Sequence, residues 1–474
     1  MRRELRKAAG RQSRWQARDT GGTLNITVTA EKPQSDQVVA KVTVPAADVD
    51  KAIAQTYKDI ARKYAFQGFR RGHAPRPVID GLVGRKAVLA QATSDVINDL
   101  TPLMIEELDI VPVDRPDFGE EAVTVVEGQD FTIEAKVSVP PTCELDSYDA
   151  PAINMPPQTA TEAEIDQQLE QLMSYHTTYE DDDEDRAVKA GDIVVMDVEN
   201  KEGAPELEGT DRTLNLSNGY LPKEFVEGVE GMKKGETKDI SWSVEHEGHE
   251  HKFEVVATLK GLKKAVVPEL DDEFAKKNFG FDTVAELRDA VKDEIEEDKK
   301  TSLPTLKEDR VVEEIGKHLT LEEIPEAYQN QVFSELGNEV LSQLQRQNIS
   351  LDMYLHARGI SGDDFMKDLH EQAEERARQS LALDALADKL ALEATEEDVR
   401  SEFEKAGVKD VDASLEEFKA NGQMPAIRES IRRTKAVSWL VENAPVTEVD
   451  EVAEARAKKA EEADGESEEK GEAE

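Results

Sequence analysis

The sequence predicts a multidomain α+β protein with an elongated, highly solvated architecture. At 474 residues the chain is too long for one ordinary core, so several domains are expected. Charged residues make up 34% of the chain and aromatic residues only 5%, which is more typical of helix-rich modules than of a compact enzyme. Apolar periodicity then predicts three parts: an α+β N-terminal part, a small β-rich middle part and a large all-α C-terminal part.

The first domain is expected over residues 23–140. Alternating or helical spacing of apolar residues predicts its elements in order: two strands within 24–44 with a turn at 31–35, a helix over 48–66, a mostly helical 78–108, and strands at 123–125 and 131–137. The preceding residues 1–22 are rich in arginine and lack the apolar run of a signal peptide. They are either a disordered extension or a basic arm that touches RNA.

The strongest chemical signal is the loop over residues 67–77, between the two helical segments of this domain. It reads Gln-Gly-Phe-Arg-Arg-Gly-His-Ala-Pro-Arg-Pro, in a chain whose formal net charge is -44. Glycine and proline bend a chain and continue a helix poorly, which predicts a tight turn. We expect this basic loop to meet a polyanion, with binding that weakens as salt rises. An ordinary surface loop whose Phe69 fills its own domain is the alternative.

A linker with a helix is expected over 141–185, because prolines bound it and residues 161–178 are amphipathic, with a capping box at Thr161 and Glu164. The acidic run 180–185 is expected to be a solvated hinge. The β-rich part over 186–266 contains strands at 193–198, 237–244 and 252–259. Residues 267–446 are expected to be helical, and 447–474 to be a disordered acidic tail. The predicted helices cover 284–299, 306–319, 325–347, 351–357, 362–392, 396–405, 415–421 and 425–441.

Several classes of function find no support in the composition. No segment is apolar for long enough to span a bilayer, so no membrane association is expected. The single cysteine, Cys143, excludes an intramolecular disulfide framework and fits a reducing cytoplasm. No glycine-rich phosphate loop is present, so the sequence shows no P-loop site for ATP. No cofactor is expected.

The loop Gly68-Phe69-Arg70-Arg71-Gly72, followed by Pro75, is similar to the ribosome-docking signature of the bacterial trigger factor family. Further similar stretches follow in family order, at 191–194, 266–274, 324–326 and 393–397. The resemblance covers nearly everything from about Thr23 to Val446.

The resemblance implies an ATP-independent cytoplasmic chaperone that docks on the large ribosomal subunit, at protein and RNA beside the tunnel exit. It would hold nascent and unfolded polypeptides and assist folding and export. The first domain would bind the ribosome, the middle module would lie at the far end, and the C-terminal helices would form a body with arms. The resemblance also leaves room for a homodimer off the ribosome.

For docking, the resemblance implies a division of labour within the loop. Phe69 would bury its ring in a protein pocket, while Arg70 and Arg71 would pair with acidic side chains or RNA phosphate. Further basic residues nearby would enlarge the positive patch: Arg62, Lys63, Arg76, Arg85 and Lys86.

The module over 186–266 resembles FKBP-type prolyl isomerases, whose apolar cradle favours a twisted X-Pro amide without acid, base or metal. The resemblance assigns five residues to this cradle: Val198, Leu207, Leu221, Phe225 and Phe253. Two positions that are aromatic in the family are aliphatic here, and the stretch ending in Phe225 carries an extra residue and no glycine. The sequence therefore predicts weak isomerase activity or a module that only binds peptides.

Some alternatives stay open at this point. The chain could be a free folding isomerase whose helices recruit clients without ribosome docking, or an acidic helical scaffold without clients. Met353, Met366 and Met424 could line a client-binding surface or belong to the helical core. His246, His249 and His251 could bind zinc or nickel, but their spacing fits no defined pattern, so we predict a solvated flap and no metal.

Overall fold

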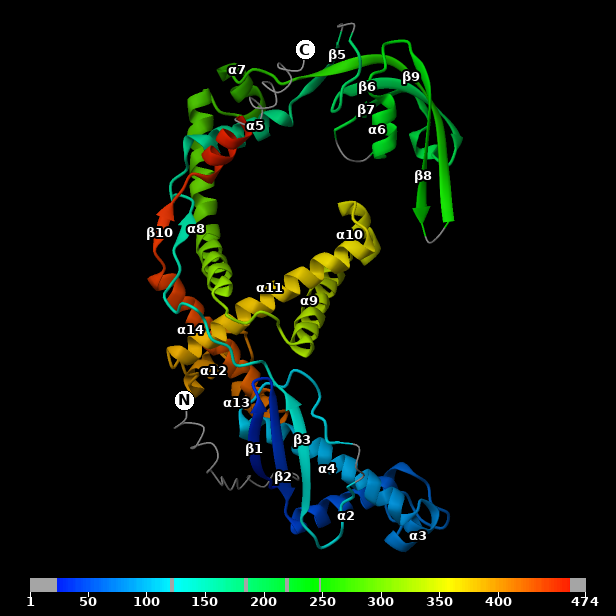
Figure 1. Ribbon diagram of the computed structural model, residues 1–474, viewed down its shortest axis with the longest axis vertical. Coiled ribbons are helices and arrows are strands. Elements are labelled where there is room, and N and C mark those ends of the chain that lie inside the picture. The colour runs from blue at the N-terminus through cyan, green and yellow to red at the C-terminus, as the bar shows by residue number, and fades with distance from the viewer. Residues whose placement is uncertain (1–23, 120–122, 183–185, 218–220, 247–248, 461–474) are drawn as a thin grey trace. The chain divides into compact units, whose positions relative to one another are not determined.

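The computed structural model describes residues 24–119, 123–182, 186–217, 221–246 and 249–460, which form two compact units (Figure 1). One unit combines the described parts of 1–155 with 304–447, and the other combines those of 156–303 with 448–474. Each unit is therefore built from two stretches that are distant in sequence. The basic stretch 1–22 and the tail end 461–474 lie outside the described residues, so the hypotheses about them stay predictions.

The N-terminal part of the first unit is a three-stranded antiparallel sheet packed against helices (Figure 1). The strands β1 (Thr27–Gln34), β2 (Gln37–Val44) and β3 (Phe131–Ser138) lie in the order β1-β2-β3. The helices are α2 (Ala46–Lys63), α3 (Arg76–Leu82) and α4 (Arg85–Leu108). Alternate residues of β3 are buried, and they share one apolar core with α2 and α4. The predicted mixture of strands and helices is confirmed.

Two local predictions in this part are wrong. Residues 123–126 do not form a strand; Val125 is buried, and its backbone N–H donates to Oγ1 of Thr93 at 3.0 Å. Because a helix side chain already accepts this N–H, the segment does not need to pair with a neighbouring strand to satisfy it. The turn expected at 31–35 is shorter, because β1 continues through an irregular register to Gln34 and turns only at 35–36.

The C-terminal part of the first unit is helical, as predicted. Its helices are α9 (Glu326–Arg346), α10 (Leu351–Arg358), α11 (Gly362–Lys389), α12 (Glu396–Lys405), α13 (Val411–Ala420) and α14 (Met424–Asn443). Side-chain caps set several starts: the Ser361 and Thr395 hydroxyls each accept from the third residue of the helix in a capping box. Helix α11 packs between α9 and α14 through buried alanines and leucines, among them Leu381 and Leu386.

A partly buried charge cluster joins α11 to α14. The Arg433 guanidinium donates to both carboxylate oxygens of Asp384, at 2.8 and 2.6 Å, and to Glu429 at 2.6 Å. Burial, together with the neighbouring Asp384, raises the pKa of Glu429 to about 7 despite the opposing charge of Arg433. Two carboxylates thus share one cation in a partly dry site, so one of them holds a proton more readily than an exposed glutamate does.

The second unit contains a five-stranded antiparallel sheet, with β5 (Thr178–Asp182), β9 (His249–Val266), β6 (Ile193–Glu202) and β7 (Gly209–Asn215) in order and β8 (Thr237–His246) paired with β9. Helix α6 (Lys223–Val229) and a 3₁₀ turn, η1 (Pro205–Leu207), accompany it. The three strands predicted here are confirmed. Strand β7 and helix α6 were not predicted.

The acidic run expected as a hinge begins as strand β5. Its carboxylates face lysines of β9, since Glu180 pairs with Lys264 and Asp181 with Lys263 in the strand register. The Asp181 carboxylate lies 3.5 Å from Nζ of Lys263. Opposite charges across the two strands therefore favour pairing where the acidic run alone would repel itself.

The rest of the second unit is helical. It contains α5 (Glu162–Ser174), α7 (Asp272–Phe274), a π-helical turn η2 (Ala275–Phe279) and the first part of α8 (Val284–Lys317). The two helices expected over 284–299 and 306–319 are one helix that runs through Pro304. Apolar residues on both sides of Pro304 are buried, and that burial outweighs the backbone hydrogen bond that proline removes.

The segment expected to be disordered from residue 447 begins with ordered structure. Strand β10 (Val446–Glu448) pairs with β4 (Ile153–Met155), and residues 451–460 are helical. The N–H of Ala453 donates to the Asp450 side chain at 2.9 Å, and Arg456 pairs with Glu170 of α5 at 2.8 Å. These polar contacts compensate for the few apolar residues of this stretch.

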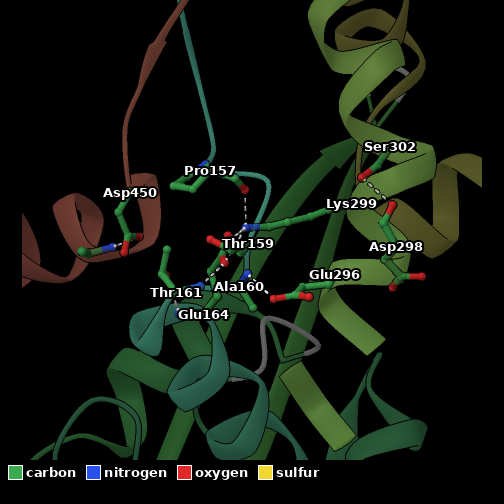
Figure 2. Close-up of polar contacts among 11 residues, drawn as sticks. Pro157, Thr159, Ala160, Thr161, Glu164, Glu296, Asp298, Lys299, Ser302 and Asp450 are labelled. Atoms are coloured by element: carbon green, nitrogen blue, oxygen red, sulfur yellow. Dashed lines mark hydrogen bonds and ion pairs between the residues drawn. The ribbon is translucent and has the colours of Figure 1, made fainter. Parts of the chain in front are cut away.

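A buried lysine organises the start of α5 (Figure 2). Nζ of Lys299, on α8, donates to the carbonyls of Pro157 and Thr159 at 2.8 and 3.0 Å and to Glu164 at 2.6 Å. Glu164 also accepts the N–H of Thr161 at 2.8 Å, so it closes the predicted capping box. All three donors of the ammonium group are satisfied inside the protein.

We expect Lys299→Met to loosen the start of α5. Methionine has similar length, but it leaves Glu164 and two carbonyls without their donor, and breaking a buried pair from one side costs about 3–5 kcal/mol. Hydrogen exchange of the amides over 160–174 should become faster. Lys300→Met, which removes an exposed pair with Glu297, is the matched control and should change little. Unchanged exchange in Lys299→Met would contradict this role.

The charge cluster predicts a pH dependence for the packing of α14. Because the folded state raises the pKa of Glu429 above its ordinary 4.5 to about 7, its contribution to stability is fully present below about pH 4.5. That contribution is lost as pH rises through about 7. In Glu429→Gln, which cannot ionise, the stability should fall less as pH rises over this range. The measurement is hydrogen exchange of α14 amides between pH 5 and 8, corrected for intrinsic exchange, with exposed Glu442→Gln as control. An unchanged pH profile in Glu429→Gln would show that another group titrates.

Candidate functional site

The basic loop, residues 67–77, is a pair of tight turns between α2 and α3. Gly68 and Gly72 have φ of +85° and +84°, a region that L side chains rarely adopt. The Gly72 N–H donates to the carbonyl of Ala61 at 2.8 Å, and the His73 N–H donates to that of Arg70 at 3.0 Å. The loop is therefore tied back to the last turn of α2. The glycine positions inferred from the sequence have a clear structural reason.

The side chains at the tip of the loop point to solvent. Phe69 is 43% exposed, and Arg70 and Arg71 are exposed. Neither arginine has an ion-pair partner among the residues that the structure describes. Pro75 has φ of -75° and occupies the position just before the first residue of α3. The loop thus offers one aromatic ring and two uncompensated guanidinium groups.

Phe66, rather than Phe69, fills the domain's own core. Its side chain is 6% exposed within the cluster of α2, α4 and the sheet, and its carbonyl accepts the N–H of Phe69 at 3.1 Å. The reading of Phe69 as an internal plug is therefore wrong. The sequence analysis missed this role of Phe66 because it placed the residue at the end of a helix over 48–66, whereas α2 ends at Lys63 and the chain turns back toward the core.

The wider positive patch expected around the loop is smaller than predicted. Arg76 and Arg85 both pair with Glu127, at 3.0 and 3.3 Å, and Arg62 lies 3.7 Å from Asp59. The guanidinium of Arg76 also lies over the ring of Tyr57, 4.9 Å from its centre. Three of the five flanking cations are thus compensated inside the protein. Lys63 and Lys86 remain exposed.

The five cradle residues predicted in the middle module come together in one apolar cluster. Val198 on β6, Leu207 on η1 and Phe225 on α6 are buried in it, and Leu221 and Phe253 pack on its edge, partly exposed. Phe225 has no exposed surface at all. Three of the five residues therefore belong to the core of the module as it stands, and only Leu221 and Phe253 offer surface to a ligand.

Trp242 on β8 was missed by the sequence analysis and lies at the centre of the aromatic group. Its ring stacks on Phe253 with centroids 5.2 Å apart and meets Phe225 edge-on at 6.3 Å. The alternation of buried Ile240 and Trp242 along β8 is the signal that could have identified it. The backbones of His246, His249 and His251 belong to β8 and β9, and the hypothesis about their side chains stays a prediction.

The helical part of the first unit exposes some of the methionines proposed for client binding. Met353 is 63% and Met366 44% exposed, whereas Met424 packs against the cluster of Val399, Phe403 and Ile431 and belongs to the core. A hollow of about 540 Å³ beside α10 is lined by Met353, Leu355 and Ile360 with two polar residues. A second hollow, of about 570 Å³, combines apolar residues such as Leu336 and Val437 with several carboxylates.

None of the helices in the described part of the chain is both long enough and apolar enough to cross a lipid bilayer. Across the described ranges, no group of three or more histidine, cysteine, aspartate or glutamate side chains is placed to hold a metal ion.

Comparison with known proteins gives a consistent family. The family model described as bacterial trigger factor protein matches residues 26–172, and that of the trigger factor C-terminus matches 283–442. The trigger factor of Lysinibacillus sphaericus (strain C3-41) is 32% identical over 88% of this chain and 99% of its own length. The trigger factor of Halalkalibacterium halodurans is 29% identical with the same coverage.

Among solved structures, a chain from work on promiscuous substrate recognition in the folding and assembly activities of the trigger factor chaperone aligns with 88% of this chain and 99% of its own. The TM-score is 0.37 at 19% identity. Because the two matched segments together cover more than half of the sequence and the similarity extends over nearly the full length of the relatives, the chain belongs to the bacterial trigger factor family.

Proposed function

We propose that this chain is an ATP-independent chaperone that docks at the tunnel exit of the large ribosomal subunit through the basic loop and holds nascent and unfolded polypeptides. Membership of the trigger factor family supports a ribosome-associated chaperone. One observation supports the docking site most directly. At the tip of the loop, Phe69 is exposed next to Arg70 and Arg71, on a turn that is hydrogen-bonded to α2.

The chemistry of the tip suits a mixed surface of protein and RNA. A guanidinium binds carboxylate or phosphate through two parallel hydrogen bonds, and an aromatic ring gains free energy by entering an apolar pocket. The two positive-φ glycines and the bond from Gly72 to Ala61 hold the tip in one conformation before binding. Preorganisation lowers the entropy lost on docking. We therefore assign docking to Gly68, Phe69, Arg70, Arg71, Gly72 and Pro75.

For client binding we propose the exposed apolar surface of the helical part. Met353 and Met366 present flexible thioethers, which adapt to many sequences. Carboxylates border the hollow beside Leu336 and Val437, which would keep such a surface soluble between clients. A homodimer off the ribosome and a cytoplasmic location remain part of this proposal.

We propose only weak prolyl isomerase activity for the module over 186–266. A cradle needs apolar side chains that touch the prolyl ring, and Phe225, Val198 and Leu207 are turned into the core. Phe253, stacked on Trp242, and Leu221 are the remaining surface for a peptide. The alternative function, a free folding isomerase without ribosome docking, would need a more open aromatic site than these residues provide.

The docking proposal predicts that Phe69→Ala with Arg70→Ala and Arg71→Ala abolishes cosedimentation with ribosomes. Truncating each anchor costs about 1–2 kcal/mol, so the affinity should fall roughly a hundredfold or more. The circular-dichroism spectrum should stay the same, because these side chains touch little of the core. A matched control, Tyr175→Ala with Lys276→Ala and Lys277→Ala, removes one exposed aromatic and two cations elsewhere and should cosediment normally. Normal cosedimentation of the loop variant would exclude the docking site.

The isomerase proposal predicts a specificity constant well below that of dedicated isomerases in a protease-coupled prolyl peptide assay. Phe253→Leu should lower the residual activity further, because it removes the aromatic surface stacked on Trp242. Phe403→Leu, in the helical part of the other unit, is the control and should have no effect on turnover. Activity close to that of a dedicated enzyme would favour the free-isomerase alternative.

A further inference from the structure

Glu127 is the common acceptor for two arginines that flank the basic loop. Nη1 of Arg76 lies 3.0 Å from Oε1 of Glu127, and Nη2 of Arg85 lies 3.3 Å from Oε2. One carboxylate therefore divides its two oxygens between two guanidinium groups. All three side chains are about half exposed or more, at 45%, 63% and 47% for Arg76, Arg85 and Glu127. They lie where a bound polyanion could compete for the arginines.

The placement of Glu127 is set by its own turn. The N–H of Gly128 donates to Asp50 of α2 at 2.8 Å, and the N–H of Gln129 donates to the carbonyl of Val126 at 3.2 Å. The turn is thus fixed to the same helix that leads into the loop. Glu127 is held in place by backbone contacts that do not depend on the arginines.

Helix electrostatics make this pairing more than an incidental surface contact. Arg76 and Arg85 are the first residues of α3 and α4, and neither helix carries an acid in its first turn. A cation at the positive end of a helix dipole is unfavourable, so an arginine in a first turn gains from a nearby carboxylate. Glu127 provides that carboxylate to both arginine side chains.

We propose that Glu127 is a specificity-determining residue: it withholds Arg76 and Arg85 from RNA phosphate, so that docking depends on Phe69, Arg70 and Arg71 at the tip. This inference rests on the proposed docking function. With Glu127 present, the tip offers two uncompensated arginines and an aromatic ring, a combination that requires a shaped partner. Without Glu127, up to four arginines would face any polyanion, and RNA of any sequence would bind.

The two arginines would not be released equally. Arg85 has the more exposed side chain, whereas Arg76 keeps its contact with the ring of Tyr57, 4.9 Å from the centroid. Cation–π contact with a buried tyrosine holds Arg76 partly in place. Removal of Glu127 should therefore free between one and two phosphate-binding groups.

The test measures the affinity of the full chain for single-stranded polyuridine RNA and for large ribosomal subunits, each across a salt series. The variant is Glu127→Gln. The control is Glu31→Gln, which makes the same change in net charge at an exposed site of β1 in the same domain. A further variant combines Glu127→Gln with Arg76→Gln and Arg85→Gln.

We expect Glu127→Gln to bind polyuridine several-fold more tightly at low salt than the unmodified chain. The slope of log affinity against log salt should steepen by about 0.7–1.4, which is about 0.7 for each of one or two additional phosphate contacts. Glu31→Gln should leave the affinity and slope unchanged. Adding Arg76→Gln and Arg85→Gln should abolish the gain. A purely structural role for Glu127 would change stability without this slope.

The proposal is overturned by an unchanged slope in Glu127→Gln, by the same gain in Glu31→Gln, or by a gain that survives loss of both arginines. If Glu127→Gln fails to fold, the proposal is tested instead with Arg76→Gln and Arg85→Gln in a chain that keeps Glu127. Unchanged RNA and ribosome affinity supports withheld arginines, and lower affinity overturns the proposal. Polyuridine binding is measured without ribosomes. A failure of the docking proposal would appear as normal ribosome cosedimentation of the loop variant, which is a separate measurement.

Discussion

Carboxylates outnumber cations in this chain, with 103 acidic against 59 basic side chains, so the location of each uncompensated cation carries information. Inside the protein, two cations stabilise contacts between separate segments. Lys299 donates hydrogen bonds to two backbone carbonyls and to Glu164, and Arg433 donates to both Asp384 and Glu429. Even on the surface, Arg76 and Arg85 are compensated. Against this background, two unpaired arginines at one loop tip form a local positive signal that a net charge of -44 would otherwise hide.

Ion pairs also connect stretches that are distant in sequence but belong to the same unit. Arg428 of α14 pairs with Glu106 at 2.5 Å and with Asp109 at the end of α4, so the N-terminal domain and the C-terminal helices are joined by charge. In the other unit, Arg456 pairs with Glu170 and so connects residues beyond β10 to α5. Apolar clusters supply most of the favourable free energy, but they are non-directional. The charge-assisted bonds select which surfaces meet.

Function divides between an ordered tip and an adaptable surface. The basic loop is fixed by two glycines in the left-handed region and by a backbone bond to α2, which suits one recurring partner. The methionines of α10 and α11 are exposed and have flexible side chains, which suits many clients. The middle module combines both features. Phe253 stacks on Trp242, and three of the five candidate residues are buried in the module's own core.

Periodicity and turn chemistry in the sequence were enough to predict the α+β class, most helices, the capping box at Thr161 and the glycine turns of the basic loop, because these depend on neighbours along the chain. The pairing of Arg76 and Arg85 was decided by Glu127, and the absence of a strand at 123–125 by Thr93, both far away in sequence. Which phenylalanine is buried was decided by the packing of the whole domain. Residues 180–182 of the acidic run joined β5 because β9 supplied lysines opposite Glu180 and Asp181. Local patterns specify local backbone, whereas the pairing of charges and the depth of each aromatic side chain exist only once the chain has folded.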